Sequence, residues 1–269
     1  MPAIKPQTAT SLLALHGVGK AFPNGTVALA GLDFDVRAGE FLSLLGPSGC
    51  GKSTALRIIA GLSPPSQGSV EWLARRVTAD QTSQIGFVFQ EPTLMPWASV
   101  FDNVSLPLVL KGVAGDTTAR RVNAALDRVG LAKFIRAFPR ELSGGMRMRV
   151  SIARALVTEP QLLLMDEPFA ALDEITRFKL NNDLLQVWRA TGTTVVFVTH
   201  SVFESVYLSS RILVMTARPG RVAAELAIEA PYPRDQNFRT SAEYAAYCRR
   251  ASTALAQAMT GDQPAGDRA

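Results

Sequence analysis

The stretch Gly46-Pro-Ser-Gly-Cys-Gly-Lys-Ser-Thr54 decides the fold, and the residues on either side of it are apolar. "FLSLL" at 41–45 precedes it and indicates a buried strand, and "ALRIIAGL" at 55–62 follows it and indicates a helix from about residue 53. The stretch fits the pattern G-x-x-x-x-G-K-[ST] in the strand–loop–helix context that this pattern requires. A tight turn that carries a surface lysine is the structural alternative.

The residue types of this loop predict a site for the phosphates of a nucleotide. Glycines let successive backbone N–H groups turn toward one point, and the helix N-terminus adds its positive dipole there. Lys52 supplies a cation for the outer phosphates, and the hydroxyl of Ser53 can ligate Mg²⁺. The residues predicted to contact the nucleotide are Gly46, Pro47, Ser48, Gly49, Cys50, Gly51, Lys52, Ser53 and Thr54.

The composition is that of a globular protein, because 47% of the 269 residues are hydrophobic and 19% are charged. No apolar run approaches the roughly 18 to 20 residues that span a bilayer, and the N-terminal "MPAIKPQTATS" lacks the apolar segment of a signal peptide. Cys50 and Cys248 form neither a disulfide framework nor a metal-ligand pattern, which favours a reducing cytosol. The net charge of +5 is spread over small groups of arginines, so we expect no nucleic-acid partner.

Alternating strand and helix patterns along the chain predict an α/β fold. Strands are expected at 12–18, 27–36, 41–45, 68–73, 85–89, 161–166, 193–199, 211–216 and 221–228. Residues 91–142 look helical and contain no convincing strand, and together with a helix at 144–158 they form an insertion over about 91–158. Further helices are expected at 174–190, shortly after residue 200 and at 241–259, and residues 260–269 look frayed.

Polar residues stand at the carboxyl ends of the predicted strands, which is where ligands bind in open α/β sheets. Gln90 ends "IGFVFQ", His200 ends "TTVVFVTH", and Asp166 and Glu167 end "LLLMDE". Asp166 could hold Mg²⁺ through water, and Glu167 could orient or deprotonate an attacking water. For His200 taken by itself, a purely structural role is the alternative.

Two further helix starts carry capping residues. Ser201 and Glu204 match a capping box, with Ser201 as N-cap. Ser143 is a good N-cap for the helix that follows "LSGGM", and Gly144 and Gly145 leave backbone N–H groups open to an anion. The chain therefore has two helix starts suited to an anion, unless the second is a capped helix that binds nothing.

From about residue 11 to residue 228, the chain resembles the nucleotide-binding subunit of ATP-binding cassette (ABC) transporters in the order and spacing of its motifs. The motifs are "GPSGCGKST" (Walker A), Gln90 (Q-loop), "LSGGM" at 142–146 (signature), "LLLMDE" (Walker B), "ALD" at 171–173 (D-loop) and His200 (switch histidine). The resemblance implies a P-loop NTPase fold: a RecA-like α/β core, an N-terminal antiparallel β part and an inserted helical subdomain. The ATP-binding domain would span 11–235, and residues 236–269 would form a C-terminal helix and tail.

The resemblance also implies an ATPase that works as a head-to-tail dimer, with ATP and Mg²⁺ as cofactors. Each ATP would lie between the Walker A loop of one subunit and Ser143, Gly144 and Gly145 of the other. The implied catalytic residues are Lys52, Gln90, Glu167 and His200, and the implied Mg²⁺ ligands are Ser53, Gln90 and Asp166. Phe22 would stack on the adenine, and Asp173 would lie at the dimer interface.

Four positions depart from the pattern of the family without removing a catalytic group. Phe22 stands where a tyrosine is usual, but a phenyl ring can also stack on a base. Met146 replaces the usual glutamine of the signature, whose phosphate contacts come from serine and glycine. Ala171 replaces a common serine of the D-loop, and Ser201 replaces the usual aspartate after the histidine.

The stretch "LMPWASVFDNVSLPL" at 94–108 resembles importers of the nitrate, sulfonate and taurine group. This likeness implies import of a small anion or a related nutrient, with separate membrane permease subunits and a periplasmic or surface solute-binding protein. The working unit would be a homodimer at the cytoplasmic face of the inner membrane. Met95 and Trp97 could form an apolar cup for a permease helix, or they could pack on their own subdomain.

Three other functions fit the same motifs. The chain could be the ATPase subunit of an exporter, or a soluble ABC protein that acts on nucleic acid or the ribosome. It could also be a cassette that binds ATP without turnover, although the presence of Lys52, Glu167 and His200 argues against that reading.

Overall fold

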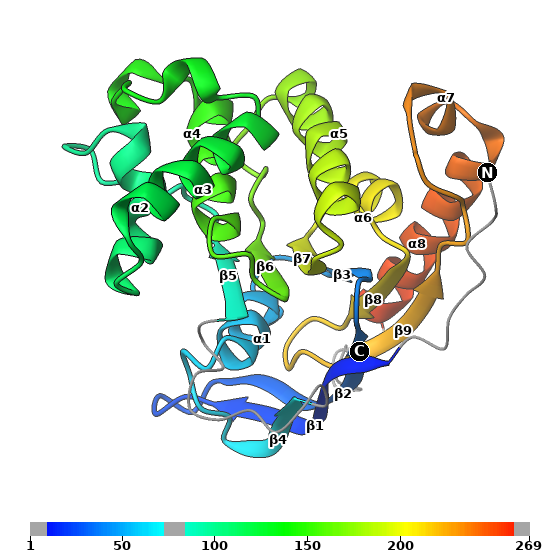
Figure 1. The fold of residues 1–269 in the computed structure, drawn as a ribbon. Helices are drawn as coiled ribbons and strands as arrows, with labels where there is room; N and C mark the ends of the chain where they lie inside the picture. The colour runs from blue at the N-terminus through cyan, green and yellow to red at the C-terminus, as the bar shows by residue number, and fades with distance from the viewer. Residues whose placement is uncertain (1–9, 73–83, 261–269) are drawn as a thin grey trace.

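The structure is a computed structural model that describes residues 10–72 and 84–260 (Figure 1). Strands and helices alternate along most of the chain, which is the pattern of an α/β protein. Its elements are β1 (Ser11–Ala21), β2 (Val27–Arg37), β3 (Phe41–Leu45), α1 (Lys52–Ile59), β4 (Gln67–Trp72), β5 (Ile85–Val88), α2 (Val100–Leu110), α3 (Gly115–Arg128), η2 (Ala132–Phe134), η3 (Pro139–Glu141), α4 (Gly144–Leu156), β6 (Leu162–Asp166), α5 (Glu174–Thr191), β7 (Thr194–Thr199), α6 (Val202–Leu208), β8 (Arg211–Met215), β9 (Val222–Ala227), α7 (Gln236–Arg239) and α8 (Ala242–Thr260).

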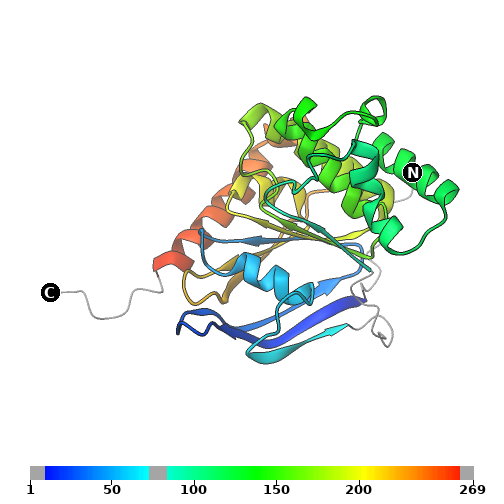
Figure 2. The same ribbon diagram turned by 90° about the vertical axis from the view of Figure 1, so that its left-hand side faces the viewer.

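Two sheets organise these elements. A six-stranded sheet has the order β5-β6-β7-β3-β8-β9, in which all neighbours are parallel except β9, which is antiparallel to β8. A three-stranded antiparallel sheet has the order β2-β1-β4. Figure 2 shows α1 between the two sheets, with α5, α6 and α8 on the opposite side of the larger sheet. The parallel strands are covered on both faces, which explains why β3, β6 and β7 are mainly apolar and are buried along their whole length.

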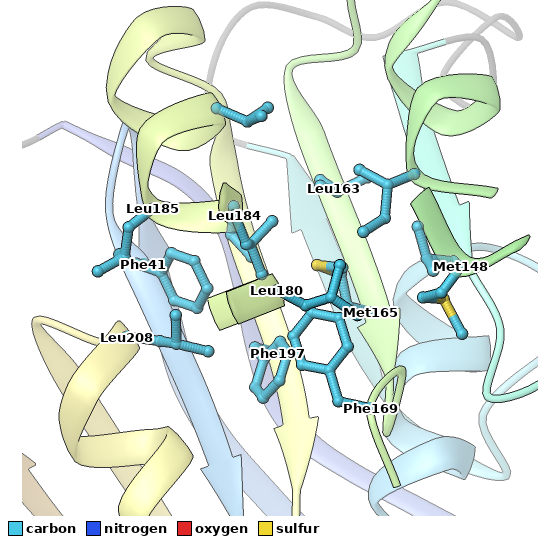
Figure 3. Close-up of a cluster of buried hydrophobic side chains, with 14 of the residues drawn as sticks. Phe41, Met148, Leu163, Met165, Phe169, Leu180, Leu184, Leu185, Phe197 and Leu208 are labelled. Atoms are coloured by element: carbon cyan, nitrogen blue, oxygen red, sulfur yellow. The ribbon is translucent and has the colours of Figure 1, made fainter. Parts of the chain in front are cut away.

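Side chains of the central strands alternate between two apolar cores, as the period of two in a strand requires. In β6, Leu162 and Leu164 pack with α1 and the smaller sheet, whereas Leu163 and Met165 face the helices on the other side. Figure 3 shows this second core, where Phe41 of β3, Phe197 of β7 and Phe169 after β6 lie among leucine and methionine side chains. Phe197 lies 5.9 Å from both of the other rings. This packing fixes the strand ends that carry the candidate site.

The predicted helical insertion is present between β5 and β6. It contains α2, α3 and α4, and no strand occurs between residues 90 and 161, all of which the structure describes. Arg154 of α4 donates hydrogen bonds of 2.9 Å to the carbonyl oxygens of Pro92 and Thr93. These bonds tie the segment that follows Gln90 to α4.

Sequence and structure agree on every predicted strand and helix, with ends that differ by a few residues. The short helix α7 was not predicted, because the sequence at 229–235 is rich in proline and turn residues. Residue 73 of one predicted strand and the frayed residues 261–269 lie outside the described residues. No helix within the described ranges is long and apolar enough to cross a bilayer.

Arg211 joins the two sheets. This buried residue of β8 forms ion pairs with Glu40 at 3.0 Å, with Asp35 of β2 at 3.1 Å and with Glu225 of β9 at 3.2 Å. Burial raises the pKa of Glu40, and the Arg211 guanidinium opposes that shift. A buried carboxylate of this kind depends on its partner, because a lone charge in the interior is costly.

We expect Arg211→Met to destabilise the fold by about 3 kcal/mol, because it leaves the carboxylate of Glu40 buried without a cation. Urea-induced unfolding measures the change. Arg37→Met is the matched control: Arg37 is half exposed and pairs with Asp35 at 3.5 Å, so its loss should cost about 1 kcal/mol or less. Equal losses in the two variants would show that Arg211 does not join the sheets.

Candidate functional site

The loop between β3 and α1 has a backbone that strongly favours glycine at two positions. Gly49 and Gly51 have φ angles of 75° and 98°, in the left-handed region that side chains disfavour. A Cβ atom at Gly51 would lie 2.6 Å from Leu29 Cδ2 and 2.7 Å from the carbonyl oxygen of Ala28. Conformation and close packing therefore both require the glycine, and α1 begins directly afterwards at Lys52.

This loop forms one wall of a cavity of about 390 Å³. The opposite wall comes from the N-terminal sheet, where Phe22 is 41% exposed at the rim. Five of the predicted loop residues line the cavity, together with predicted residues Phe22 and Glu167. The five loop residues are Gly49, Gly51, Lys52, Ser53 and Thr54. Gly46, Pro47, Ser48 and Cys50 lie in the same loop but do not line the cavity.

Lys52 is buried at the base of the loop, with its ammonium group fixed from several sides. Its Nζ donates to the carbonyl oxygens of Gly46 and Pro47 at 2.8 Å each. The same Nζ lies 3.4 Å from Oε1 of Glu167. The ammonium group is thus held at a defined position between its own loop and Glu167.

Asp166 and Ser53 present two hard oxygen atoms side by side. The Ser53 hydroxyl donates to Oδ1 of Asp166 at 2.7 Å. Burial raises the pKa of Asp166, and the neighbouring charge of Glu167 raises it further. A bound divalent cation would stabilise the charged form of Asp166 against both the burial and the charge of Glu167. Hydroxyl and carboxylate oxygens are ligands that suit Mg²⁺. The donor set therefore fits the predicted metal.

Glu167 is held between Lys52 and His200. Its Oε2 lies 2.9 Å from Nδ1 of His200, whose side chain is 47% exposed. Its backbone has a φ of 44°, and its N–H donates to the carbonyl oxygen of Val198 at 3.0 Å. A left-handed glutamate costs about 1 to 3 kcal/mol and is typical of functional sites. The turn directs the carboxylate toward the cavity.

Glu204 supports the strand end that carries His200, a role that sequence reasoning missed. Ser201 is the N-cap of α6, as predicted, and accepts from the Glu204 N–H at 3.3 Å. The other half of the predicted capping box is absent, because the Glu204 carboxylate instead accepts from the Thr199 hydroxyl at 2.6 Å. Oε1 of Glu204 also lies 3.6 Å from Nε of Arg177. The nearby Thr199 hydroxyl and the distant Arg177 guanidinium therefore take the place of the bond to the Ser201 N–H.

Asp166 and His200 contact Ser53 and Glu167 without lining the cavity, and the remaining predicted residues do not line it either. Gln90 is exposed, two residues beyond β5. Ser143 caps α4 by accepting from the Met146 N–H at 3.3 Å, and Gly144 and Gly145 form the first turn of that helix. Asp173 caps α5 by accepting from the Thr176 N–H at 2.9 Å, and this hydrogen bond lowers the pKa of Asp173.

Gly145 has a packing role that the sequence did not indicate. A Cβ atom at this position would lie 2.7 Å from Cγ2 of Thr176 in α5. Three residues of the cavity were likewise missed: Thr26, Ala28 and Arg218. Thr26 and Ala28 lie in or next to β2, and Arg218 lies in the turn between β8 and β9, so only the tertiary fold brings them to the loop.

The strand–loop–helix motif and the acidic strand ends of this sheet define a P-loop nucleoside triphosphatase. Within that class, the chain belongs to the ABC transporter family, whose model matches residues 29–170. It is 46% identical over 222 residues to the aliphatic sulfonates import ATP-binding protein SsuB of Bacillus subtilis, covering 82% of this chain and 84% of that protein. It is 44% identical over 247 residues to an uncharacterized ABC transporter ATP-binding protein of Methanocaldococcus jannaschii, and the match covers 92% of this chain and 89% of that protein.

Solved structures agree with this assignment. CbiO1 of Clostridium perfringens, part of the ABC transporter complex cbiONQ, matches with a TM-score of 0.74 and 30% identity, covering 81% of this chain and 89% of that one. The dimeric bacterial ABC transporter cassette MJ0796 matches with a TM-score of 0.70 and 34% identity, covering 81% and 100%. The chain is therefore an ABC-type ATPase subunit that binds ATP.

We expect Lys52→Ala to lower ATP turnover roughly 100-fold, because it removes the cation fixed at the base of the loop. Phosphate release at saturating ATP measures the change. Lys133→Ala is the control, since Lys133 is exposed in η2 and should leave turnover unchanged. Full turnover in the Lys52 variant would contradict the assignment of this loop to the phosphates.

Proposed function

We propose that this subunit hydrolyses ATP at a head-to-tail dimer interface to power import of a small anion through a separate permease. The observation that carries the ATPase chemistry is the contact of Glu167 with both Lys52 and His200. Relatives named for import of aliphatic sulfonates support the choice of an organic or inorganic anion such as a sulfonate, taurine or nitrate.

Each group around the cavity has a defined task in the proposed reaction. Backbone N–H groups of the loop and Lys52 bind the phosphates, and Phe22 stacks on the adenine. Ser53, Asp166 and Gln90 would hold Mg²⁺, which would neutralise charge on the outer phosphates.

Glu167 acts as the general base in this proposal. Its carboxylate orients an attacking water and accepts a proton from it, and His200 keeps the carboxylate in place through Oε2. The water oxygen attacks the γ-phosphorus while the bond to the bridging oxygen of ADP breaks, giving ADP and inorganic phosphate.

The second helix start completes the site of the opposite subunit. Ser143, Gly144 and Gly145 begin α4 but do not line the cavity of their own chain. Their N–H groups and the helix dipole suit the γ-phosphate of ATP bound to a partner. The dimeric state of the MJ0796 cassette supports this arrangement. Asp173, exposed at the start of α5, would lie at the same interface.

Mixing two inactive variants tests whether the signature acts in trans. Ser143→Arg should abolish turnover while leaving ATP affinity of the monomer unchanged. Mixed with Lys52→Ala, it should restore about a quarter of wild-type turnover, because half of the dimers are mixed and each mixed dimer has one intact site. Phosphate release from the mixture measures this. A signature that acted on its own cavity would leave the mixture inactive.

A rigid apolar surface suits the permease. The indole of Trp97 is 77% exposed. Its loop is fixed by buried Asn103, whose Oδ1 accepts from Met95 N–H at 2.7 Å and whose Nδ2 donates to the carbonyl oxygens of Met95 and Ala98 at 3.1 Å. A groove of about 510 Å³ opens nearby between β5, α2 and α4, with Phe89 and Leu110 among its lining residues. We assign this surface to a cytoplasmic helix of the permease, which would place the subunit at the cytoplasmic face of the inner membrane.

Affinity capture tests the permease assignment. Tagged Glu167→Gln protein, in which hydrolysis is blocked, should retain a multi-span protein from detergent-solubilised native membranes in roughly equal amount. Trp97→Asp should lose that protein, since it places a charge in an apolar contact. Met259→Asp, at an exposed methionine of α8, is the control and should retain it. Recovery of soluble partners alone would contradict the transport role.

The captured membrane protein then distinguishes import from export. Reconstituted with its solute-binding protein, an importer should hydrolyse ATP faster when that protein carries its ligand, and the panel to test is ethanesulfonate, taurine and nitrate. Turnover stimulated by a solute without any binding protein would indicate an exporter instead.

A further inference from the structure

Arg218 reaches the nucleotide cavity from an element far from the loop in sequence. Its Nε donates to the carbonyl oxygen of Gly49 at 2.9 Å. A Cβ atom at Gly49 would lie 2.7 Å from Nη2 of Arg218, so the guanidinium rests against the bare Cα of the glycine. The bond to Gly49 uses one of the five N–H donors of the guanidinium and leaves the two Nη groups available beside the cavity.

The turn that carries Arg218 is anchored to both walls of the cavity. The N–H of Gly220 donates to the carbonyl oxygen of Ala28 at 2.9 Å, and the N–H of Ala30 donates to the carbonyl oxygen of Gly220 at 3.1 Å. A Cβ atom at Gly220 would lie 2.1 Å from the carbonyl oxygen of Cys50, so only glycine allows this approach. The Thr216 hydroxyl closes the turn by donating to the carbonyl oxygen of Pro219 at 2.8 Å. The backbone therefore holds Arg218 at the loop.

The charge of Arg218 is not neutralised by the protein. Within residues 10–72 and 84–260, no carboxylate lies within ion-pair distance of it, whereas Arg211 has three such partners. The other charged residues that line the cavity are Lys52 and Glu167, which pair with each other at 3.4 Å. The cavity thus carries an excess positive charge, and Arg218 supplies it.

We propose that Arg218 binds the phosphate chain of the nucleotide and is a fixed part of the site. This inference rests on the proposed function of the cavity. The guanidinium sits over Gly49, in the middle of the phosphate loop, and its fork of N–H donors matches phosphate oxygens. Arg218 therefore binds the phosphates, and Phe22 contacts the base.

Binding of ADP and GDP by calorimetry tests this without interference from turnover. Arg218→Gln should weaken both nucleotides by roughly 10-fold, the loss expected for one charged hydrogen bond. Arg218→Lys, which keeps the charge, should recover part of the affinity. Arg221→Gln is the matched control: Arg221 is an exposed arginine of the same turn that does not line the cavity, and its loss should change neither affinity.

The outcomes separate this inference from the proposed function. Equal losses for ADP and GDP in Arg218→Gln, with Arg221→Gln unchanged, support a phosphate contact. Wild-type affinity in Arg218→Gln overturns the inference and leaves the nucleotide site standing. A loss confined to ADP overturns it by placing Arg218 at the base. Failure of the wild-type protein to bind either nucleotide overturns both the inference and the proposed site.

Discussion

The proposed nucleotide site depends on the Glu167 carboxylate staying between the Lys52 ammonium and the His200 ring. These residues follow three adjacent strands, β6, β3 and β7, whose carboxyl ends are level because Leu45 pairs with Thr199 and Asp166 pairs with Val198. A slip of one residue in either ladder would turn each side chain to the opposite face. The apolar packing around Phe197 therefore fixes the chemistry as well as the fold.

The packing of the strands also holds the left-handed backbone at Glu167. The conformation is unfavourable for a glutamate, and it persists because the residue before it is in the sheet and its own N–H is bonded to β7. A more relaxed turn would move the carboxylate away from the imidazole. Stability of the two cores thus maintains a local geometry that the segment would not adopt by itself.

Local signals made most of the fold predictable from sequence. The short apolar runs of the strands and the loop pattern depend on neighbouring residues, so every strand and nearly every helix was predicted from these signals. Sequence reasoning also placed Glu167 and His200 at strand ends on one edge of a parallel sheet, and the structure brings the two side chains into contact.

Contacts between distant segments were not predictable in the same way. Arg218 lies 169 residues from the carbonyl group to which it donates, and no spacing rule connects the two. The predicted capping box at Ser201 and Glu204 failed because the buried carboxylate bonds to the neighbouring Thr199 hydroxyl and lies against Arg177 of α5 instead of the Ser201 N–H. Sequence patterns describe what a residue can do locally, and the tertiary fold decides which partner it takes.

The bonds from Arg154 to Pro92 and Thr93 have a mechanical consequence. They attach the segment between Gln90 and Trp97 to the C-terminal end of α4. Ser143 lies at the N-terminal end of the same helix. A helix of 13 residues is a stiff rod about 20 Å long. In the proposed dimer, a permease on the Trp97 loop and a partner's phosphate on Ser143 would therefore act on opposite ends of this one helix.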